Sequence, residues 1–185
     1  MLPTSLTSDP RAYALFVAAL IALVAWQRTL SWREYAPLHR LKTTVLPILD
    51  RLKRHPAVPI PAGLLLISRK GYREHDAEFL TTDADSVRAV WQRLVAGGAS
   101  PHLINSVKRR PTPDGGTQLS AAHVVWLHAD GTQTEAYLFA AVESGGTDIY
   151  AHHEPSVTDP EAHLSGAQRN GDPRGVVRAA LDRDA

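Results

Sequence analysis

Histidines and carboxylates near the C-terminus are the residues of this chain whose types could do chemistry. His152, His153 and Glu154 are consecutive, and Glu161 and His163 follow shortly after them. Imidazole nitrogens and carboxylate oxygens bind zinc or iron, but a site needs three or four of them converging on one ion. On a strand, His152 and His153 would point to opposite faces and could not chelate together. A metal site at His152, His153 and His163 is therefore the less favoured alternative, and we predict no cofactor.

Other signatures of catalysis are missing from the sequence. The chain has no cysteine, which excludes disulfides and a cysteine nucleophile. It also has no GxSxG elbow, HExxH motif, P-loop or GxGxxG. The basic cluster 108–110 is too short for a nucleic-acid footprint, so we expect no nucleic-acid partner. The sequence favours a non-catalytic interaction or ligand-sensing module, and the alternative is a small membrane-tethered metal-dependent hydrolase.

The elements that position these residues begin with an apolar run near the N-terminus. Residues 12–26 read AYALFVAALIALVAW and carry no charge. A helix from Pro10 to Leu30 would rise close to the thickness of the hydrocarbon core, about 30 Å. A secretory signal peptide has a similar apolar length, but its basic residues usually precede the core. A core helix of a soluble domain is the other alternative. We expect an uncleaved membrane anchor.

The charge pattern after this run predicts the orientation of the anchor. Basic residues are in excess directly after it, and basic segments stay on the cytoplasmic side of a membrane. We therefore expect a single-pass protein of the cell membrane, with the N-terminus outside and the C-terminal domain in the cytoplasm. The basic residues that we expect at the lipid headgroups are Arg28, Arg33, Arg40 and Lys42.

The next segment has the pattern of an amphipathic helix. Apolar residues recur at steps of three and four, which makes one apolar seam along residues 32–55. The seam consists of Leu38, Leu41, Val45, Ile48 and Leu52. We expect this helix to lie on the membrane interface or on its own domain, and a parallel homodimer through the seam is the alternative. Pro47 is expected to kink or end the helix, and the proline-rich segment 56–62 to form an extended spacer.

The remaining chain predicts an α+β fold. We expect a four- to five-stranded, mainly antiparallel sheet with one packed helix, followed by a short C-terminal helix. The packed helix carries the stripe from Val87 to Val95, with Asp83 or Asp85 as its cap and Trp91 in the core. The expected strands are 63–68, 78–82, 102–110, 118–128, 132–143 and 147–152. The expected units are 1–31 (anchor), 32–55 (amphipathic helix), 56–62 (spacer), 63–153 (domain) and 154–185 (polar tail with the short helix).

The register of one hairpin predicts a partner-binding face. If Asp130 and Gly131 form a two-residue turn, Trp126 lies opposite Glu135 and Val124 lies opposite Tyr137. We expect the face with Trp126, Glu135 and Tyr137, together with Phe139, to hold a protein partner that the sequence does not identify. The residues expected on the helix-covered face are Leu119, Val125, Leu127, Leu138 and Ala140.

Overall fold

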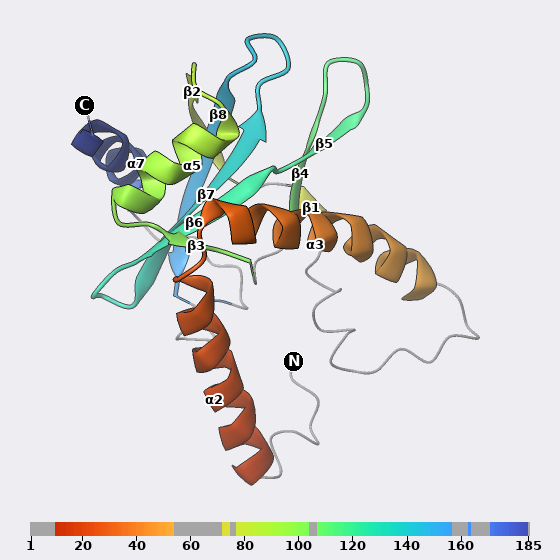
Figure 1. Cartoon of the computed structure of the whole chain (residues 1–185), viewed down its shortest axis with the longest axis vertical. Coiled ribbons are helices and arrows are strands. Elements are labelled where there is room, and N and C mark those ends of the chain that lie inside the picture. The colour runs from red at the N-terminus through yellow and green to blue at the C-terminus, as the bar shows by residue number, and fades with distance from the viewer. Residues whose placement is uncertain are drawn as a thin grey trace.

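The computed structural model describes residues 10–53, 72–74, 77–103, 107–156, 163 and 171–184. These residues form an α+β fold with a mainly antiparallel sheet, which confirms the predicted class (Figure 1). The predicted strand 63–68 and the predicted spacer 56–62 lie outside the described residues.

A five-stranded antiparallel sheet is the centre of the fold. Its strand order is β2-β8-β7-β6-β3, so two hairpins, β6-β7 and β7-β8, form its middle. Its strands are β2 (Glu78–Asp83), β3 (Ser100–Pro101), β6 (Ala122–Leu127), β7 (Thr132–Ala140) and β8 (Thr147–Pro155). A smaller sheet of order β1-β4-β5 lies beside it, with β1 parallel to β4. Its strands are β1 (Tyr72–Glu74), β4 (Val107–Pro111) and β5 (Thr117–Leu119).

Two helices pack together on one face of the large sheet (Figure 1). The helix α5 (Val87–Ala96) buries its apolar stripe there, and α7 (Pro173–Leu181), followed by the short helix η1 (Asp182–Asp184), lies against it. Ser86 rather than an aspartate caps α5, because its hydroxyl accepts a hydrogen bond from the Ala89 N–H. The two helices approach closely at Gly97, where a Cβ would lie 2.6 Å from the Cα of Ala180. A side chain at Gly97 would therefore separate the helices.

The hairpin β6-β7 has a different register from the predicted one. Its loop spans residues 129–131, and the His128 N–H donates across it to the Thr132 carbonyl at 2.9 Å. This loop is one residue longer than a two-residue turn, and Gly131 adopts the positive φ of +78° that it needs. Trp126 consequently pairs with Thr134, and Val125 pairs with Glu135. Because side chains alternate along a strand, this shift of one residue moves Trp126 to the other face.

The helix-covered face therefore has a different composition from the predicted one. Its central residues are Val124, Trp126, Ala136 and Leu138. Of the five residues expected there, Leu138 alone belongs to this core cluster. Val125 and Leu127 alternate with the core residues of β6 and lie on the opposite face. Leu119 belongs to the smaller sheet, and Ala140 is exposed at the end of β7.

Two long helices lead into this domain. The helices α2 (Pro10–Gln27) and α3 (Trp32–Lys53) are joined by a short turn. Gln27 at the end of α2 and Leu30 in the turn are buried. The Gln27 side-chain oxygen accepts a hydrogen bond from the Leu103 N–H at 3.0 Å. The end of α2 and the start of α3 are thus built into the core, not held away from it.

The helix α3 contacts the domain with a face other than the predicted apolar seam. The ring centres of Trp32 and Tyr35 in this helix each lie 5.2 Å from the ring centre of Trp91 in α5. His39 lies one helical turn after Tyr35 and Lys42 lies two turns after it, so both share the contact face of Tyr35. His39 is buried there, and Lys42 donates to a backbone carbonyl of the domain. The seam residues Leu41, Val45 and Ile48 are exposed, and Leu38 is half-buried against the core. The helix also continues through Pro47 to Lys53, so of the two effects expected of this proline, a kink or an end, the end is wrong.

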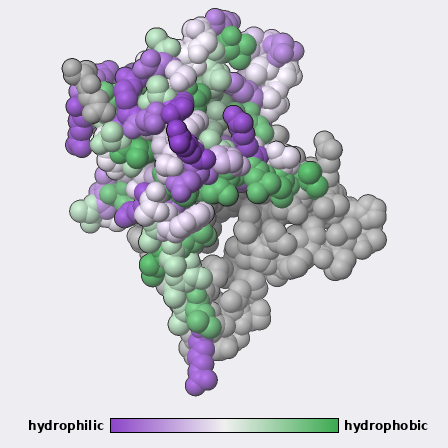
Figure 2. Space-filling model, viewed as in Figure 1, coloured by the Kyte–Doolittle hydropathy of each residue, from purple (hydrophilic) through white to green (hydrophobic). Residues whose placement is uncertain are grey.

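The helix α2 leaves the body of the protein and exposes apolar side chains along its length (Figures 1 and 2). Leu15 is 72% exposed and Ile21 is 63% exposed. Of the helices that the structure describes, none has the combined length and apolar character that a complete membrane crossing requires.

Candidate functional site

Polar side chains line the face of the large sheet that the helices α5 and α7 leave uncovered. They come from alternating positions of three neighbouring strands, which the register brings side by side. Glu135 and Tyr137 belong to β7, His152 and Glu154 to β8, and His123 to β6. Four of these five side chains are buried, and Glu154 is half-buried. This polar face is the candidate functional site.

A carboxylate–histidine cluster occupies one part of this face. We define it as Glu135, Glu154, His152, His102, Gln133 and Tyr137. The Gln133 amide donates to Glu135 Oε1 at 2.9 Å and to Glu154 Oε1 at 2.8 Å. The second oxygen of each carboxylate faces His152, whose Nε2 lies 3.7 Å from Glu135 Oε2 and 3.5 Å from Glu154 Oε2. The Tyr137 hydroxyl donates to Glu135 Oε2 and lies 3.2 Å from His152 Nε2.

Glu135 is an ionised group at the centre of the cluster. Burial alone would raise its pKa, but the charge and hydrogen bonds of His102 and His152 outweigh it and hold the pKa well below the usual range. The His102 Nδ1 atom lies 3.2 Å from Glu135 Oε1. A carboxylate that is 2% exposed therefore keeps its negative charge inside the domain.

The helix α3 covers the edge of the sheet next to this cluster. The Tyr35 hydroxyl accepts a hydrogen bond from the His123 backbone N–H at 2.7 Å, and His39 Nε2 donates to the Ser120 carbonyl at 2.9 Å. Lys42 donates to the Leu103 carbonyl at 2.8 Å. Tyr35 and His39 thus pair backbone groups in and next to β6, and Lys42 pairs one just after β3. Polar contacts, rather than the apolar seam, hold the middle of α3.

Burial shifts the titration of these groups. It lowers the pKa of Lys42 to about 7, although the carboxylate of Glu135 acts in the opposite direction. Burial and the charge of Lys42 lower the pKa of His39 to about 4. The same two causes hold the pKa of His123 well below its usual range. Both histidines are therefore neutral at physiological pH, and Lys42 loses its proton within the physiological range.

The shift at Lys42 predicts a pH-dependent stability. Above about pH 7 the folded chain releases the Lys42 proton, whereas the unfolded chain keeps it to about pH 10.5. The unfolded state then binds more protons, so the free energy of unfolding rises with pH in this window, by up to about 1.4 kcal/mol per unit. Lys42→Met should remove this contribution. Urea unfolding followed by circular dichroism measures the free energy of unfolding of both proteins. The variant should be the more stable one near pH 7, and the difference between the two free energies should decrease as the pH rises.

A matched variant separates this effect from loss of charge. Arg40→Met removes a positive charge from the exposed side of the same helix. Its stability difference from the wild type should stay constant between about pH 7 and pH 10, because arginine does not titrate there. A constant difference for Lys42→Met as well would show that Lys42 has an ordinary pKa.

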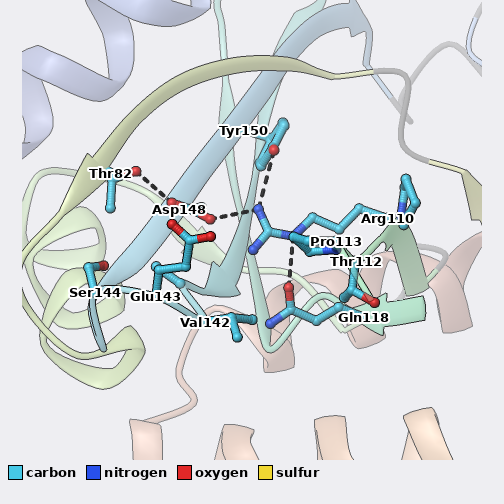
Figure 3. Close-up of a pocket in the computed structure, with 12 residues that line it drawn as sticks. Thr82, Arg110, Thr112, Pro113, Gln118, Val142, Glu143, Ser144, Asp148 and Tyr150 are labelled. Atoms are coloured by element: carbon cyan, nitrogen blue, oxygen red, sulfur yellow. Dashed lines mark hydrogen bonds and ion pairs between the residues drawn. The ribbon is translucent and has the colours of Figure 1, made fainter. Parts of the chain in front are cut away.

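A pocket of about 380 Å³ opens where the two sheets meet (Figure 3). Arg110 from β4 points into it and pairs with Asp148 of β8, with Nη1 and Oδ2 2.7 Å apart. The Gln118 amide oxygen accepts from Arg110 Nε at 2.7 Å, and the guanidinium carbon lies 4.7 Å from the ring centre of Phe139. Asp148 also accepts from the Thr82 hydroxyl at 2.6 Å. The charged groups of this Arg110 pocket are thus held rigidly in place.

The rim of the Arg110 pocket is chemically mixed. Thr112 and Pro113 come from the β4-β5 turn, and Val142, Glu143 and Ser144 come from the β7-β8 turn. Hydroxyl, carboxylate and apolar groups therefore surround the opening. Pockets of roughly 300–1,000 Å³ with a few fixed polar groups are the usual size and character of small-molecule sites.

The three residues predicted to hold a partner do not form one surface. Trp126 packs in the helix-covered core, whereas Glu135 and Tyr137 lie on the polar face. All three are buried. The one-residue difference in the hairpin loop separates Trp126 from the other two. Phe139 is also buried, beneath Arg110 and beside Tyr150.

The structure brings together part of the predicted metal set. His152 and His163 both approach Glu154, since His163 Nδ1 lies 3.4 Å from Glu154 Oε1. His153 lies on the other face of β8, beside Thr134 and His128. Among the described residues, the group that can offer three ligand atoms to one ion is Glu135, His152 and Glu154, with these atoms within 4.8 Å of one another.

The predicted headgroup residues divide into two groups. Arg28, Arg33 and Arg40 are exposed. Lys42 lies on the contact face of α3, where its amino group donates to the Leu103 carbonyl.

The sequence interpretation missed several residues of the polar face. His102 follows β3 and Arg110 lies in β4, so no spacing along the chain relates them to Glu135 or Asp148. Gln133 lies two positions before Glu135 in β7, a spacing that places both side chains on one face of a strand. In the basic cluster 108–110, Lys108 is buried over the Tyr137 ring, 5.0 Å from its centre. Comparison of the chain with family models, with curated proteins and with solved structures gives no match.

Proposed function

We propose that this protein is a membrane-tethered, non-catalytic interaction or ligand-sensing module whose α+β domain lies on the cytoplasmic side. The observation that carries the proposal is the exposed apolar surface of α2, whose last turn is fixed in the domain through Gln27. Apolar side chains such as Leu15 and Ile21 gain free energy when they leave water, and lipid is the environment that buries a whole projecting helix.

The length of α2 fits a short anchor. Its 18 residues rise about 27 Å, slightly less than the hydrocarbon thickness of about 30 Å. Local thinning of the bilayer and flanking residues that reach the headgroups accommodate such a difference. Trp26 and Arg28 follow the apolar run and are exposed, and tryptophan and arginine favour this interface. The excess of basic residues after α2 supports the cytoplasmic position of the domain.

The helix α3 supports the same arrangement. It runs sideways from the end of α2 (Figure 1). Leu41, Val45 and Ile48 are exposed, and helical spacing places them on a different side of α3 from Tyr35, His39 and Lys42. An amphipathic helix in this position lies along the membrane interface. A homodimer through the same residues is the competing arrangement, and crosslinking of the full-length chain in vesicles distinguishes them.

The Arg110 pocket is the ligand site in this proposal. Its size and its fixed polar groups suit a small polar molecule that carries both hydrogen-bond donors and acceptors. The metal-dependent hydrolase is supported less well, because His153 lies apart from His152 and His163. The buried position of Glu135 and His152 also leaves no open coordination position of the kind that catalytic metal sites keep.

One experiment tests both parts of the proposal. Full-length protein from lysed cells is floated on a density gradient, and a reporter fused to the C-terminus reports the side of the membrane. We expect flotation with the membranes and a cytoplasmic reporter. Native mass spectrometry of the detergent-purified chain should then show a bound small molecule, which Val142→Trp displaces by filling the pocket. Soluble recovery or an external reporter would contradict the tether, and identical spectra would contradict the pocket.

A further inference from the structure

We propose that Glu135, His152 and Glu154 bind one divalent transition-metal ion, of the kind represented by Zn²⁺. This inference goes beyond the proposed function, because it concerns the carboxylate–histidine cluster and not the Arg110 pocket. The ligand atoms are Glu135 Oε2, Glu154 Oε2 and His152 Nε2.

The distances between His152 and the two carboxylates suit shared coordination of one ion. His152 Nε2 lies 3.7 Å and 3.5 Å from the two carboxylate oxygens, beyond the usual hydrogen-bond length of about 2.7–3.2 Å. Two ligands of tetrahedral zinc, each about 2.0–2.1 Å from the ion, are about 3.4 Å apart. A ring nitrogen also carries at most one proton, so His152 Nε2 cannot donate to both Glu135 and Glu154. A shared cation can take one atom of each of the three groups as a ligand.

The outer contacts orient both carboxylates towards the same point. Gln133 donates to the Oε1 atom of Glu135 and to that of Glu154. A histidine lies beside each of the same two Oε1 atoms, His102 at 3.2 Å and His163 at 3.4 Å. Each Oε2 atom is thereby turned to His152. Outer groups that fix the direction of the ligands are a general feature of metal sites.

The charge of the cluster also calls for a cation. Two carboxylates lie within a few ångströms of each other, and Glu135 is buried. A divalent ion with a neutral imidazole balances the charge of two carboxylates. The Tyr137 hydroxyl, which donates to Glu135 Oε2 and lies 3.2 Å from His152 Nε2, borders the proposed site. Because the site is closed, we assign the ion a stabilising role between β7 and β8.

The test uses the full-length chain in detergent, stripped of metal with a chelator and then titrated with Zn²⁺. Calorimetry should show one Zn²⁺ per chain, and thermal unfolding should shift to higher temperature. Glu154→Gln keeps the size and the hydrogen bond of this side chain but removes its charge, and should weaken Zn²⁺ binding by about tenfold or more. His153→Gln, one residue away on the other face, should bind Zn²⁺ as the wild type does.

Each of three results would overturn the proposal. Wild-type protein that gives no heat of binding and no thermal shift would show that protonated histidines, not a metal, balance the carboxylates. Equal affinity of Glu154→Gln and wild type would place the ion elsewhere. Loss of binding in His153→Gln alone would assign the ion to the His128 and His153 pair, whose ring centres lie 5.2 Å apart. The midpoint of thermal unfolding without metal shows whether each variant is folded.

Discussion

Replacing Leu15 and Ile21 together by arginine is expected to release the protein from membranes. Both side chains are exposed on α2 and neither belongs to the core of the domain. A charged residue near the centre of a membrane helix costs about 2.5–3.5 kcal/mol, so the two substitutions together cost about 5–7 kcal/mol. Flotation of lysates should move the variant from the membrane fraction to the soluble fraction, with the domain still folded.

A conservative pair of substitutions is the control for this experiment. Leu15→Ile with Ile21→Val keeps the apolar character of both positions and should float with the membranes as the wild type does. If the arginine variant also floated fully, α2 would not be inserted in lipid. Membrane association would then have to come from another surface, of which the exposed seam of α3 is the first to test.

Trp91→Ala is expected to cause the largest loss of stability in the domain itself. Trp91 is 2% exposed and lies between the helix-covered sheet face and the rings of Trp32 and Tyr35. Removal of a buried tryptophan ring costs about 3–5 kcal/mol, because it takes away apolar contacts and leaves a cavity. Urea unfolding of the full-length chain, followed by far-ultraviolet circular dichroism, measures this difference.

The same chain provides a matched tryptophan. Trp26 is 47% exposed near the end of α2, and Trp26→Ala should change the unfolding free energy of the domain by less than about 1 kcal/mol. Equal effects of the two substitutions would mean that α3 is not docked on α5. The fluorescence of Trp32 reports that docking directly, since its ring packs edge-on against Trp91.

Local patterns in the sequence were sufficient to predict most of the elements. The apolar stripe from Val87 to Val95 predicts α5, and Pro173 with the residues after it predicts α7; both helices are confirmed. The hairpin strands β6, β7 and β8 also agree with the strands predicted between glycine-containing turns. These elements depend on neighbours in the chain, so periodicity and turn residues specify them.

The arrangement of the site depended on contacts that periodicity does not describe. A loop one residue longer than expected moved Trp126 to the other face, because side chains on a strand alternate with a period of two. The seam of α3 is exposed because aromatic and polar side chains of the same helix found partners on Trp91, Ser120 and Leu103. Local hydrophobicity identifies an amphipathic helix but not the surface on which it docks.

The amino-acid sequence by itself determined the α+β class, the principal helices and hairpins, and the apolar and basic character of the N-terminal third. The tertiary structure alone decided which charges meet: Arg110 with Asp148, and Glu135 with His102 and His152. The physical reason is that secondary structure follows from the preferences of consecutive residues. A polar site inside a sheet requires strands from distant parts of the chain to pair in one register.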